Sequence, residues 1–466
     1  MDTNNLQAAA KGNNNACHIV AMPYPARGHI NPMLNLCNLL ASRKPEILIT
    51  FVVTEEWLGL IDSDSYTKNI SFATIPDNII PSEKNQLDDG ITFVTAVMTK
   101  LEAPFERILD RLCPPVTTII TDALLLWAVD TGNRRNIPVA ALWISSASTF
   151  SICYHCDLFK EKQFPLDLEE HADDIIDFIP GISSIRVADV PSFFHNKQYS
   201  LDGRGFKLPV SKAQYFLSTS VYELESQVFN VFKSKFNIPV YSVGPLIPYK
   251  SELNCESSTS SCHEDPHYIK WLNSKPTSSV LYVSMGSLFK VSSAQLDELV
   301  AGVKMSGVRC LWVGRDETCR LQEGFMNDLG LVVPWCDQLR VLSHSSVGGF
   351  LTHCGWGSVL EAAFVGVPML ALPIMVDHFT ISKQIVEDWK IGWRLNKDIR
   401  GEHLVTGEEI AKTIHTFMDI NSSEREELVK RAKQVEDIFQ GATAKGGSSD
   451  TNLDAFIKDI TQGQAH

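Results

Sequence analysis

Residues that could bind a phosphate group lie together between positions 347 and 361, in the sequence VGGFLTHCGWGSVLE. Residues 347–352 form a short apolar run that predicts a strand, and its two glycines would let another backbone come close. Residues 353–357 then predict a tight turn. Ser358 follows at an N-cap position, and Glu361 stands at the spacing of a capping box, which predicts a helix that begins directly after the serine.

The chemistry expected of this turn is the binding of an anion. A helix N-terminus carries free backbone N–H groups and the positive end of the helix dipole, so it suits a phosphate. The side chains of His353 and Ser358 would add donors at the same place. A glycine-rich turn by itself favours the alternative, an ordinary connection between a strand and a helix, so the assignment depends on the residues around it.

A second group of candidates follows two predicted strands in the first third of the chain. His29 comes after the buried strand 17–22 and a turn, and directly before a helix predicted from Ile30. Asp122 comes directly after the strand 116–121. The carboxyl ends of parallel strands form the ligand side of a doubly wound sheet. Taken alone, a histidine in such a turn is more often bonded to the backbone, and an aspartate more often caps the next helix.

The longer stretch 335–378 resembles the signature box of the plant family-1 UDP-glycosyltransferases, enzymes that transfer sugars from nucleotide donors to small molecules. The stretch has the length of the box, and chance is a poor explanation for so many matches at fixed spacing. The matching positions are Trp335, Gln338, His344, Gly348, Gly349, residues 352–356, Ser358, Glu361, residues 366–368, Pro373 and Asp377.

The resemblance assigns the nucleoside part of the donor to the start of the box. Trp335 would stack its indole on the uracil ring, and the backbone at Cys336 would read the edge of the base. Gln338 and Glu361 would bond the ribose hydroxyls, because a carboxylate can accept twice from a diol.

The diphosphate and the sugar are assigned to later positions. His353, Ser358 and the turn at Trp356 and Gly357 would hold the diphosphate and stabilise the charge on the leaving UDP. Ser287, in a second Gly-Ser turn after a predicted strand, would touch the same group. At the end of the box, the resemblance places Asp377 and His378 against the sugar hydroxyls.

The resemblance also changes the interpretation of the two residues outside the box. The family carries its catalytic base in the PxxGHxxP context of His29, and a carboxylate at the position of Asp122 orients and charges that histidine. His29 would take the acceptor's proton as the acceptor attacks the anomeric carbon with inversion. The UDP-sugar is a co-substrate, and we expect no cofactor and no metal.

Two positions depart from the family pattern. Gly357 replaces the usual Asn, which removes one side-chain donor to the phosphate or the sugar. His378 replaces the usual final Gln, which in the family accompanies glucose, whereas His occurs in some enzymes that use galactose or a pentose. We expect glucose as the donor sugar first, with galactose or a pentose as alternatives.

The elements that must position these residues predict an α/β protein. A chain of 466 residues is too long for one core, and strand and helix signals alternate along it, which predicts parallel sheets. The resemblance implies two facing Rossmann-like domains, the GT-B fold. The expected parts are a disordered leader (1–16), an acceptor-binding domain (17–248), a Ser-rich linker (249–265), a UDP-sugar-binding domain (266–451), and a last helix with a tail (452–466) that packs back on the first domain.

The composition and motifs of the chain argue against several other classes of function. The net charge of −14 argues against nucleic acids or anionic membranes as partners, and no apolar stretch reaches the ~18 residues of a membrane span. The eleven cysteines are scattered, as in a reduced cytoplasmic protein. The absence of a GxGxxG fingerprint disfavours a nicotinamide dehydrogenase.

The expected function is therefore transfer of a hexose from a UDP-sugar to a hydroxyl of a small lipophilic acceptor, such as a phenolic, flavonoid, terpenoid or hormone, by a monomeric enzyme. The alternative is a non-catalytic protein that binds a nucleotide or small molecule on the same fold. Residues 150–178 and 187–207 are expected to line the acceptor cleft, although their aromatic side chains also fit ordinary core packing.

Overall fold

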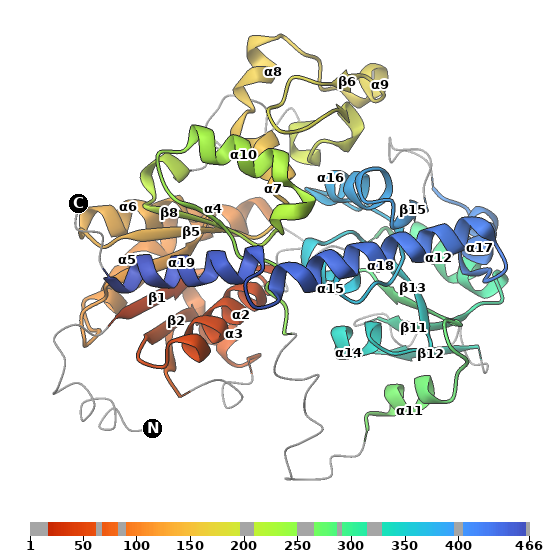
Figure 1. Cartoon of the computed structure of the whole chain (residues 1–466), viewed down its shortest axis with the longest axis horizontal. Coiled ribbons are helices and arrows are strands. Elements are labelled where there is room, and N and C mark those ends of the chain that lie inside the picture. Colours follow the sequence, from red (N-terminus) through yellow and green to blue (C-terminus); the bar gives the residue numbers. More distant parts are fainter. Residues whose placement is uncertain are drawn as a thin grey trace.

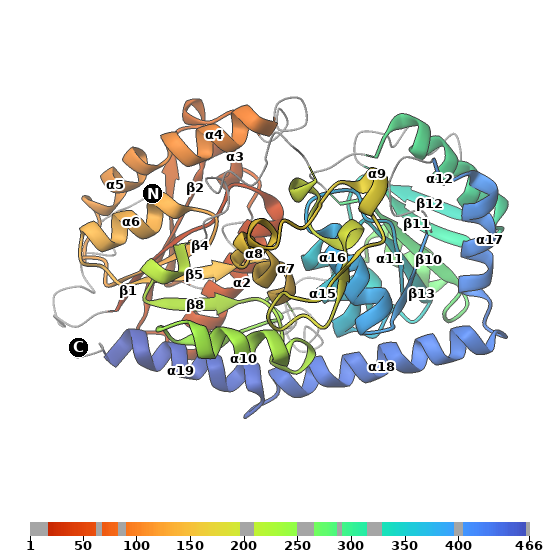
Figure 2. The same ribbon diagram turned by 90° about the horizontal axis from the view of Figure 1, so that it is seen from above.

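The computed structural model describes residues 17–61, 68–82, 90–195, 209–248, 265–286, 291–314, 329–395 and 404–462. It contains two parallel sheets that lie side by side, each flanked by helices, as Figures 1 and 2 show. The prediction of an α/β protein with two mainly parallel sheets is confirmed. The expected leader, all of the expected linker except Asp265, and the candidate Ser287 lie outside the described residues.

The first sheet has seven strands in the order β3-β2-β1-β4-β5-β8-β9, all parallel. All five residues of β1 are buried, because helices cover both faces of the sheet. Val20 and Met22 point into one core and Ile19 and Ala21 into the other. The strands are β1 (His18–Met22), β2 (Leu48–Thr54), β3 (Ile70–Ile75), β4 (Thr118–Asp122), β5 (Val139–Trp143), β8 (Tyr215–Ser218) and β9 (Val240–Ser242).

Helices of the first half connect these strands. The predicted helix at Ile30 begins earlier, at Arg27, and residues 90–109 form two helices that are separated at Leu101. The bounds are α2 (Arg27–Arg43), α3 (Glu55–Leu58), α4 (Gly90–Lys100), α5 (Glu102–Leu109), α6 (Leu126–Arg134), α7 (Ala147–Tyr154) and α10 (Ser226–Lys235), with 3-10 turns η2 (Asp77–Ile79), η7 (Pro209–Lys212) and η8 (Tyr222–Leu224).

An insertion between α7 and η7 has a small core of its own. Phe159 and Phe194 are buried there, so much of the aromatic content of this segment serves packing. Its elements are α8 (Asp157–Glu161), α9 (Leu168–His171), the antiparallel pair β6 (Ile175–Ile176) and β7 (Ile185–Arg186), η4 (Val187–Asp189) and η5 (Ser192–Phe194).

The second sheet has six parallel strands in the order β12-β11-β10-β13-β14-β15. The predicted strand 347–352 is β13, confirmed with the same bounds. The strands are β10 (Val280–Ser284), β11 (Arg309–Val313), β12 (Gly330–Val333), β13 (Val347–Thr352), β14 (Met369–Ala371) and β15 (Gly392–Arg394).

The helices of the second half include a short π-helix. This element, η9, ends at Asp388, and the chain then enters β15, although residues 385–393 read as one helix in the sequence. Gly392 permits this, since a Cβ there would lie 2.5 Å from the carbonyl oxygen of Met369 on β14. The helices are α11 (His267–Asn273), α12 (Ser293–Met305), α14 (Gln338–Leu342), α15 (Trp356–Phe364), α16 (His378–Lys383), η9 (Gln384–Asp388) and α17 (Gly407–Met418).

The last two helices connect the halves. Helix α18 (Ser423–Thr443) lies along the second half, and α19 (Ser448–Gln462) lies along the first, as Figure 2 shows. Phe456 of α19 packs in the same core as Ile19 of β1, and Arg43 forms ion pairs with Asp450 and Asp454. In the part of the chain that the structure describes, no helix combines the length and the apolar character needed to cross a bilayer.

Candidate active site

The first-half site is built on two neighbouring strands. His29 lies in the first turn of α2, after β1, and Asp122 is the last residue of β4, which pairs with β1. Nδ1 of His29 lies 2.6 Å from Oδ2 of Asp122, and the other carboxylate oxygen accepts from the backbone N–H of Leu124 at 2.9 Å. The carboxylate therefore favours the proton on Nδ1 and leaves Nε2 of the imidazole as a proton acceptor.

The electrostatic surroundings favour protonation of His29. Burial lowers its pKa, but the carboxylates of Asp122 and Asp377 outweigh burial, and the pKa is raised above its ordinary value. The ring of Tyr24 packs against His29 with centroids 5.2 Å apart. Since the side chain of His29 stays 26% exposed while that of Asp122 is 2% exposed, the imidazole remains accessible to a substrate.

Asp377 joins the two halves at this point. Its Oδ2 accepts a hydrogen bond of 2.5 Å from Oγ of Ser145, which follows β5 in the first half. Burial raises the pKa of Asp377, while the serine hydroxyl and the charge of His29 oppose this shift. Asp377, which is predicted to face the sugar, thus lies close enough to the predicted base, His29, to raise its pKa.

The glycine-rich turn after β13 differs from its predicted form. Helix α15 begins at Trp356, with Gly355 as its N-cap and no side-chain capping bond. The predicted capping box of Ser358 and Glu361 is therefore wrong, because Ser358 lies inside the helix and not at its N-cap. Both side chains accept instead from Nε2 of Gln338, at 3.0 and 2.6 Å. The first-turn N–H groups of the helix have no intrahelical acceptor, so this end retains the donors expected of an anion site.

His353 occupies the space between two turns. A Cβ added to Gly286 or to Gly355 would meet Nε2 of the imidazole at 2.4 or 2.3 Å, so both positions need glycine. Nδ1 of His353 is buried and has no hydrogen-bond partner among the described residues. Burial and the neighbouring His378, whose ring lies 5.0 Å away, lower the pKa of His353 to about 3. The imidazole is thus neutral and offers one donor and one acceptor nitrogen.

The predicted ribose residues form one hydrogen-bond network. Gln338, which bonds Ser358 and Glu361 through Nε2, accepts from the hydroxyl of Tyr282 at 3.1 Å through Oε1. That hydroxyl also lies 3.5 Å from Sγ of Cys336. Burial raises the pKa of Glu361 to about 7, and the bond from Gln338 opposes this shift.

The remaining candidates for binding the UDP-sugar, Trp335, Trp356 and Gly357, differ in their exposure and contacts. Trp335 is 60% exposed, which suits a ring that stacks on a ligand. Trp356 is buried, and its indole N–H donates to Oγ1 of Thr219 in the first half at 3.0 Å. Its side chain therefore joins the halves, and only its backbone N–H remains to bind the UDP-sugar. A Cβ at Gly357 would meet nothing within 4 Å.

Several residues of this region were not predicted. Tyr282 lies inside a strand that reads as plain core, and Thr219 and Ser145 are short polar residues at strand ends with no motif of their own. Each acts through a partner that is distant in the sequence. Among the described residues, no group of three or more His, Cys, Asp or Glu side chains could hold a metal ion.

Two Rossmann-like halves, one with a histidine–carboxylate pair at its strand ends and one with a glycine-rich turn before a helix, have the architecture of the glycosyltransferases of the GT-B fold. The sequence model of the family described as "UDP-glucoronosyl and UDP-glucosyl transferase" matches residues 201–414. UDP-glycosyltransferase 87A1 of Arabidopsis thaliana is 47% identical over 95% of this chain and 100% of its own, and UDP-glycosyltransferase 87A2 of the same plant is 46% identical over 95% and 97%. The chain belongs to the plant UDP-glycosyltransferases and is an enzyme that transfers a glycosyl group from a UDP-sugar.

Solved structures support the same assignment. Os79 from O. sativa in complex with UDP is 25% identical, with a TM-score of 0.81, over 95% of this chain and 100% of its own. UGT2 of Phytolacca americana, complexed with UDP-2fluoro-glucose and pterostilbene, is 25% identical, with a TM-score of 0.77, over 96% and 100%.

Proposed function

We propose that this enzyme transfers a hexose, glucose first, from its UDP-sugar to a hydroxyl of a small lipophilic acceptor, with inversion at the anomeric carbon. The observation that carries the proposal is the 2.6 Å contact between His29 and Asp122, with Asp377 in the same electrostatic environment. The pair supplies a base on the first half, and Asp377, the carboxylate proposed to face the sugar, lies beside it on the second half.

In the proposed reaction, Nε2 of His29 accepts the proton of the acceptor hydroxyl. The hydroxyl oxygen forms a bond to the anomeric carbon on the face opposite UDP, and the bond from that carbon to the phosphate oxygen breaks. UDP leaves with the electron pair, and Asp122 stabilises the imidazolium that forms. Base catalysis of this kind contributes roughly 10²- to 10⁴-fold in rate.

The donor is proposed to lie on the second half. Trp335 stacks on uracil, the backbone at Cys336 reads the base edge, and Gln338 with Glu361 bonds the ribose. The N-terminal turn of α15, Ser358, Ser287 and the unpartnered Nδ1 of His353 stabilise the diphosphate as negative charge builds on it. This arrangement calls for no metal and no other cofactor, and full activity in excess EDTA is the expected result.

The choice of glucose is supported by relatives and qualified by one residue. The 7-deoxyloganetin glucosyltransferase of Catharanthus roseus is 30% identical to this chain, and the Phytolacca americana structure carries a fluorinated UDP-glucose. His378 in place of the usual Gln keeps galactose and pentoses open as donors. The same structure holds pterostilbene, a phenolic, which supports a phenolic or similarly apolar acceptor.

We also propose that the enzyme acts as a cytoplasmic monomer. The eight cysteines in the described ranges are all free thiols, as a reducing compartment favours. Light scattering after size-exclusion chromatography should give about the chain mass of 51.9 kDa. A dimer mass would contradict the monomer.

The test of the function is a panel of UDP-sugars with a generic phenolic acceptor, run on the wild type, His29→Ala and His29→Gln. We expect turnover by the wild type, a loss of at least roughly 10²-fold in both variants, and UDP affinity unchanged by calorimetry. Wild-type activity in either variant would exclude His29 as the base. Turnover of UDP-galactose well above UDP-glucose would overturn the choice of sugar.

A further inference from the structure

The residue before Asp377 has an unusual backbone conformation. Val376 has φ of +57°, in the left-handed region that a β-branched residue rarely adopts. Such a conformation persists only where surrounding contacts enforce it. Its direct consequence is the direction in which the chain presents Asp377 and then His378, the first residue of α16.

One residue of the other half holds both backbone polar groups of Val376. The N–H of Ser192 donates to the carbonyl oxygen of Val376 at 2.9 Å, and the N–H of Val376 donates to Oγ of Ser192 at 2.7 Å. The pair closes a ring between segments 184 residues apart in the sequence. These bonds favour the strained conformation, because a different φ at Val376 would redirect its N–H and leave it without this acceptor.

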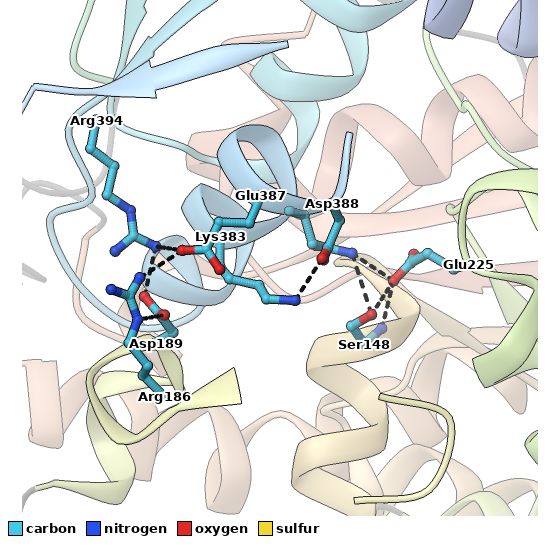
Figure 3. Close-up of polar contacts among 9 residues, drawn as sticks. Ser148, Arg186, Asp189, Glu225, Lys383, Glu387, Asp388 and Arg394 are labelled. Carbon is cyan, nitrogen blue, oxygen red and sulfur yellow. Dashed lines mark hydrogen bonds and ion pairs between the residues drawn. The ribbon is translucent and has the colours of Figure 1, made fainter. Parts of the chain in front are cut away.

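The segment that carries Ser192 is itself fixed to the second half by a buried carboxylate. Asp189 is 1% exposed, and its two oxygens pair with Nε of Arg186 at 2.8 Å and Nη2 of Arg394 at 2.6 Å. Its backbone oxygen accepts from Oγ1 of Thr380 on α16 at 2.7 Å. Figure 3 shows Asp189 between the two arginines, with Glu387 beside them.

A second buried carboxylate holds the middle of the same region, at Gln384. Glu225 accepts from the backbone N–H of Ser148 at 2.7 Å and from Nε2 of Gln384, in η9, at 2.8 Å. Figure 3 places Glu225 and Ser148 on the side of the region away from Asp189. The first half thus holds residues 376–394 at several points along their length. Ser145 bonds the carboxylate of Asp377 itself, and Ser192 holds the backbone directly before it.

We infer that Ser192 is a positioning residue for the donor sugar: its two hydrogen bonds keep Val376 left-handed, so that Asp377 and His378 face the sugar beside His29. The inference rests on the proposed function, in which Asp377 and His378 bond the sugar hydroxyls. It predicts that Ser192 affects the sugar and not the nucleotide, because the uracil, ribose and diphosphate residues lie on other elements.

The experiment compares Ser192→Ala, which deletes the acceptor, with Ser192→Thr, which keeps a hydroxyl. The control is Ser234→Ala, which deletes a surface hydroxyl that donates to the carbonyl oxygen of Val231 in the same helix, α10. Measurements are kcat and KM for the donor, Kd for UDP, and Tm. In Ser192→Ala we expect kcat/KM to fall roughly tenfold with Kd for UDP unchanged. Ser192→Thr should recover most of the activity, and Ser234→Ala should match the wild type.

A rescue separates positioning from general packing. Glycine adopts positive φ without strain, so in a Val376→Gly background the Ser192→Ala change should cost less than about threefold. An undiminished effect in that background would overturn the inference, as would a fall in UDP affinity equal to the fall in kcat/KM, or a crystal structure of Ser192→Ala with φ at Val376 unchanged.

Failure of the proposed function gives a different result. If Asp377→Asn transfers sugar as the wild type does, the proposed role of Asp377 fails, whatever Ser192→Ala does. If Asp377→Asn is impaired and Ser192→Ala is not, the function stands and the positioning role of Ser192 fails.

Discussion

Nδ1 of His29 and Oδ2 of Asp122 lie 2.6 Å apart although the residues are 93 positions apart in the chain, because each follows a strand and the two strands are neighbours. The sheet order β3-β2-β1-β4-β5 runs outward in opposite directions from β1 and β4. This is the topological switch point, where connections leave to opposite sides and the strand ends stay open to a ligand. The predicted base and its carboxylate partner occupy that point.

Replacement of Asp122 by Asn should lower the rate and move its pH dependence. Transfer needs neutral His29, so the wild-type rate should rise as pH increases through the raised pKa of this histidine. The amide removes the nearest negative charge, so the pKa of His29 should fall and the acidic limb should move to lower pH. We expect a plateau roughly 10²- to 10⁴-fold lower, since the amide no longer fixes the tautomer.

The measurement for Asp122→Asn is kcat against pH from 5 to 9, with UDP affinity as the control for folding. Asp130→Asn is a matched surface change, because Asp130 pairs, within the described ranges, only with the exposed Lys212. An acidic limb that stays in place, or moves to higher pH, would show that Asp122 does not set the pKa of His29.

The strands that carry the site could be predicted from the sequence, because strands buried on both faces read as unbroken apolar runs. This held for β1, β4 and β13. It failed for β14 and β15, which have three residues each and no distinguishable pattern. The capping box failed for another reason: the helix begins at Trp356, before Ser358, and both side chains of the expected box bond Gln338, which lies outside the local pattern.

The contacts between the halves could not be predicted. Ser145 with Asp377, Ser192 with Val376, and Glu225 with Gln384 join residues 232, 184 and 159 positions apart. None of the first-half partners belongs to a motif with a fixed ligand, and a serine after a strand is common. Their effect depends on how the two halves meet, which local spacing does not encode.

Glu361 should make nucleoside binding depend on pH. Its pKa of about 7 means that the carboxylate, which can accept from both ribose hydroxyls, becomes fully available only as pH rises through neutrality. Uridine is the appropriate probe, because it has no phosphate that titrates in the same range. We expect its affinity to increase roughly threefold to tenfold between pH 6 and 8, and to be independent of pH in Glu361→Gln. A flat profile in the wild type would contradict the raised pKa.

Gly357→Asn should strengthen donor binding. The space beside Gly357 is open, so the side chain fits, and the amide restores the donor that the family usually carries at this position. One hydrogen bond corresponds to about 0.5–1.5 kcal/mol, or roughly a 2- to 12-fold lower KM for the donor. Gly357→Ala is the control, since it gives the helix a better residue without an amide. Equal improvement in both variants would assign the gain to helix stability and not to the donor.

His378→Gln should shift the choice of sugar toward glucose. His378 is 5% exposed, and burial lowers its pKa to about 3, so the ring is neutral throughout the working range of pH. A neutral imidazole offers one donor and one acceptor, whereas an amide offers two donors and an acceptor with a different reach. We expect the ratio of kcat/KM for UDP-glucose to that for UDP-galactose to rise roughly threefold to tenfold in the variant.

The same measurement repeated at several pH values tests the protonation state that this argument assumes. A neutral His378 predicts a wild-type donor ratio that stays constant from pH 6 to 9, even while the absolute rate follows the titration of His29. His378→Asn, whose amide is shorter by one methylene, is the matched control for reach and should give a smaller shift than Gln. If the wild-type ratio changes with pH while that of His378→Gln does not, the imidazole titrates in this range and charge contributes to the choice of sugar. If none of the variants alters the ratio, the sugar is selected by residues other than His378.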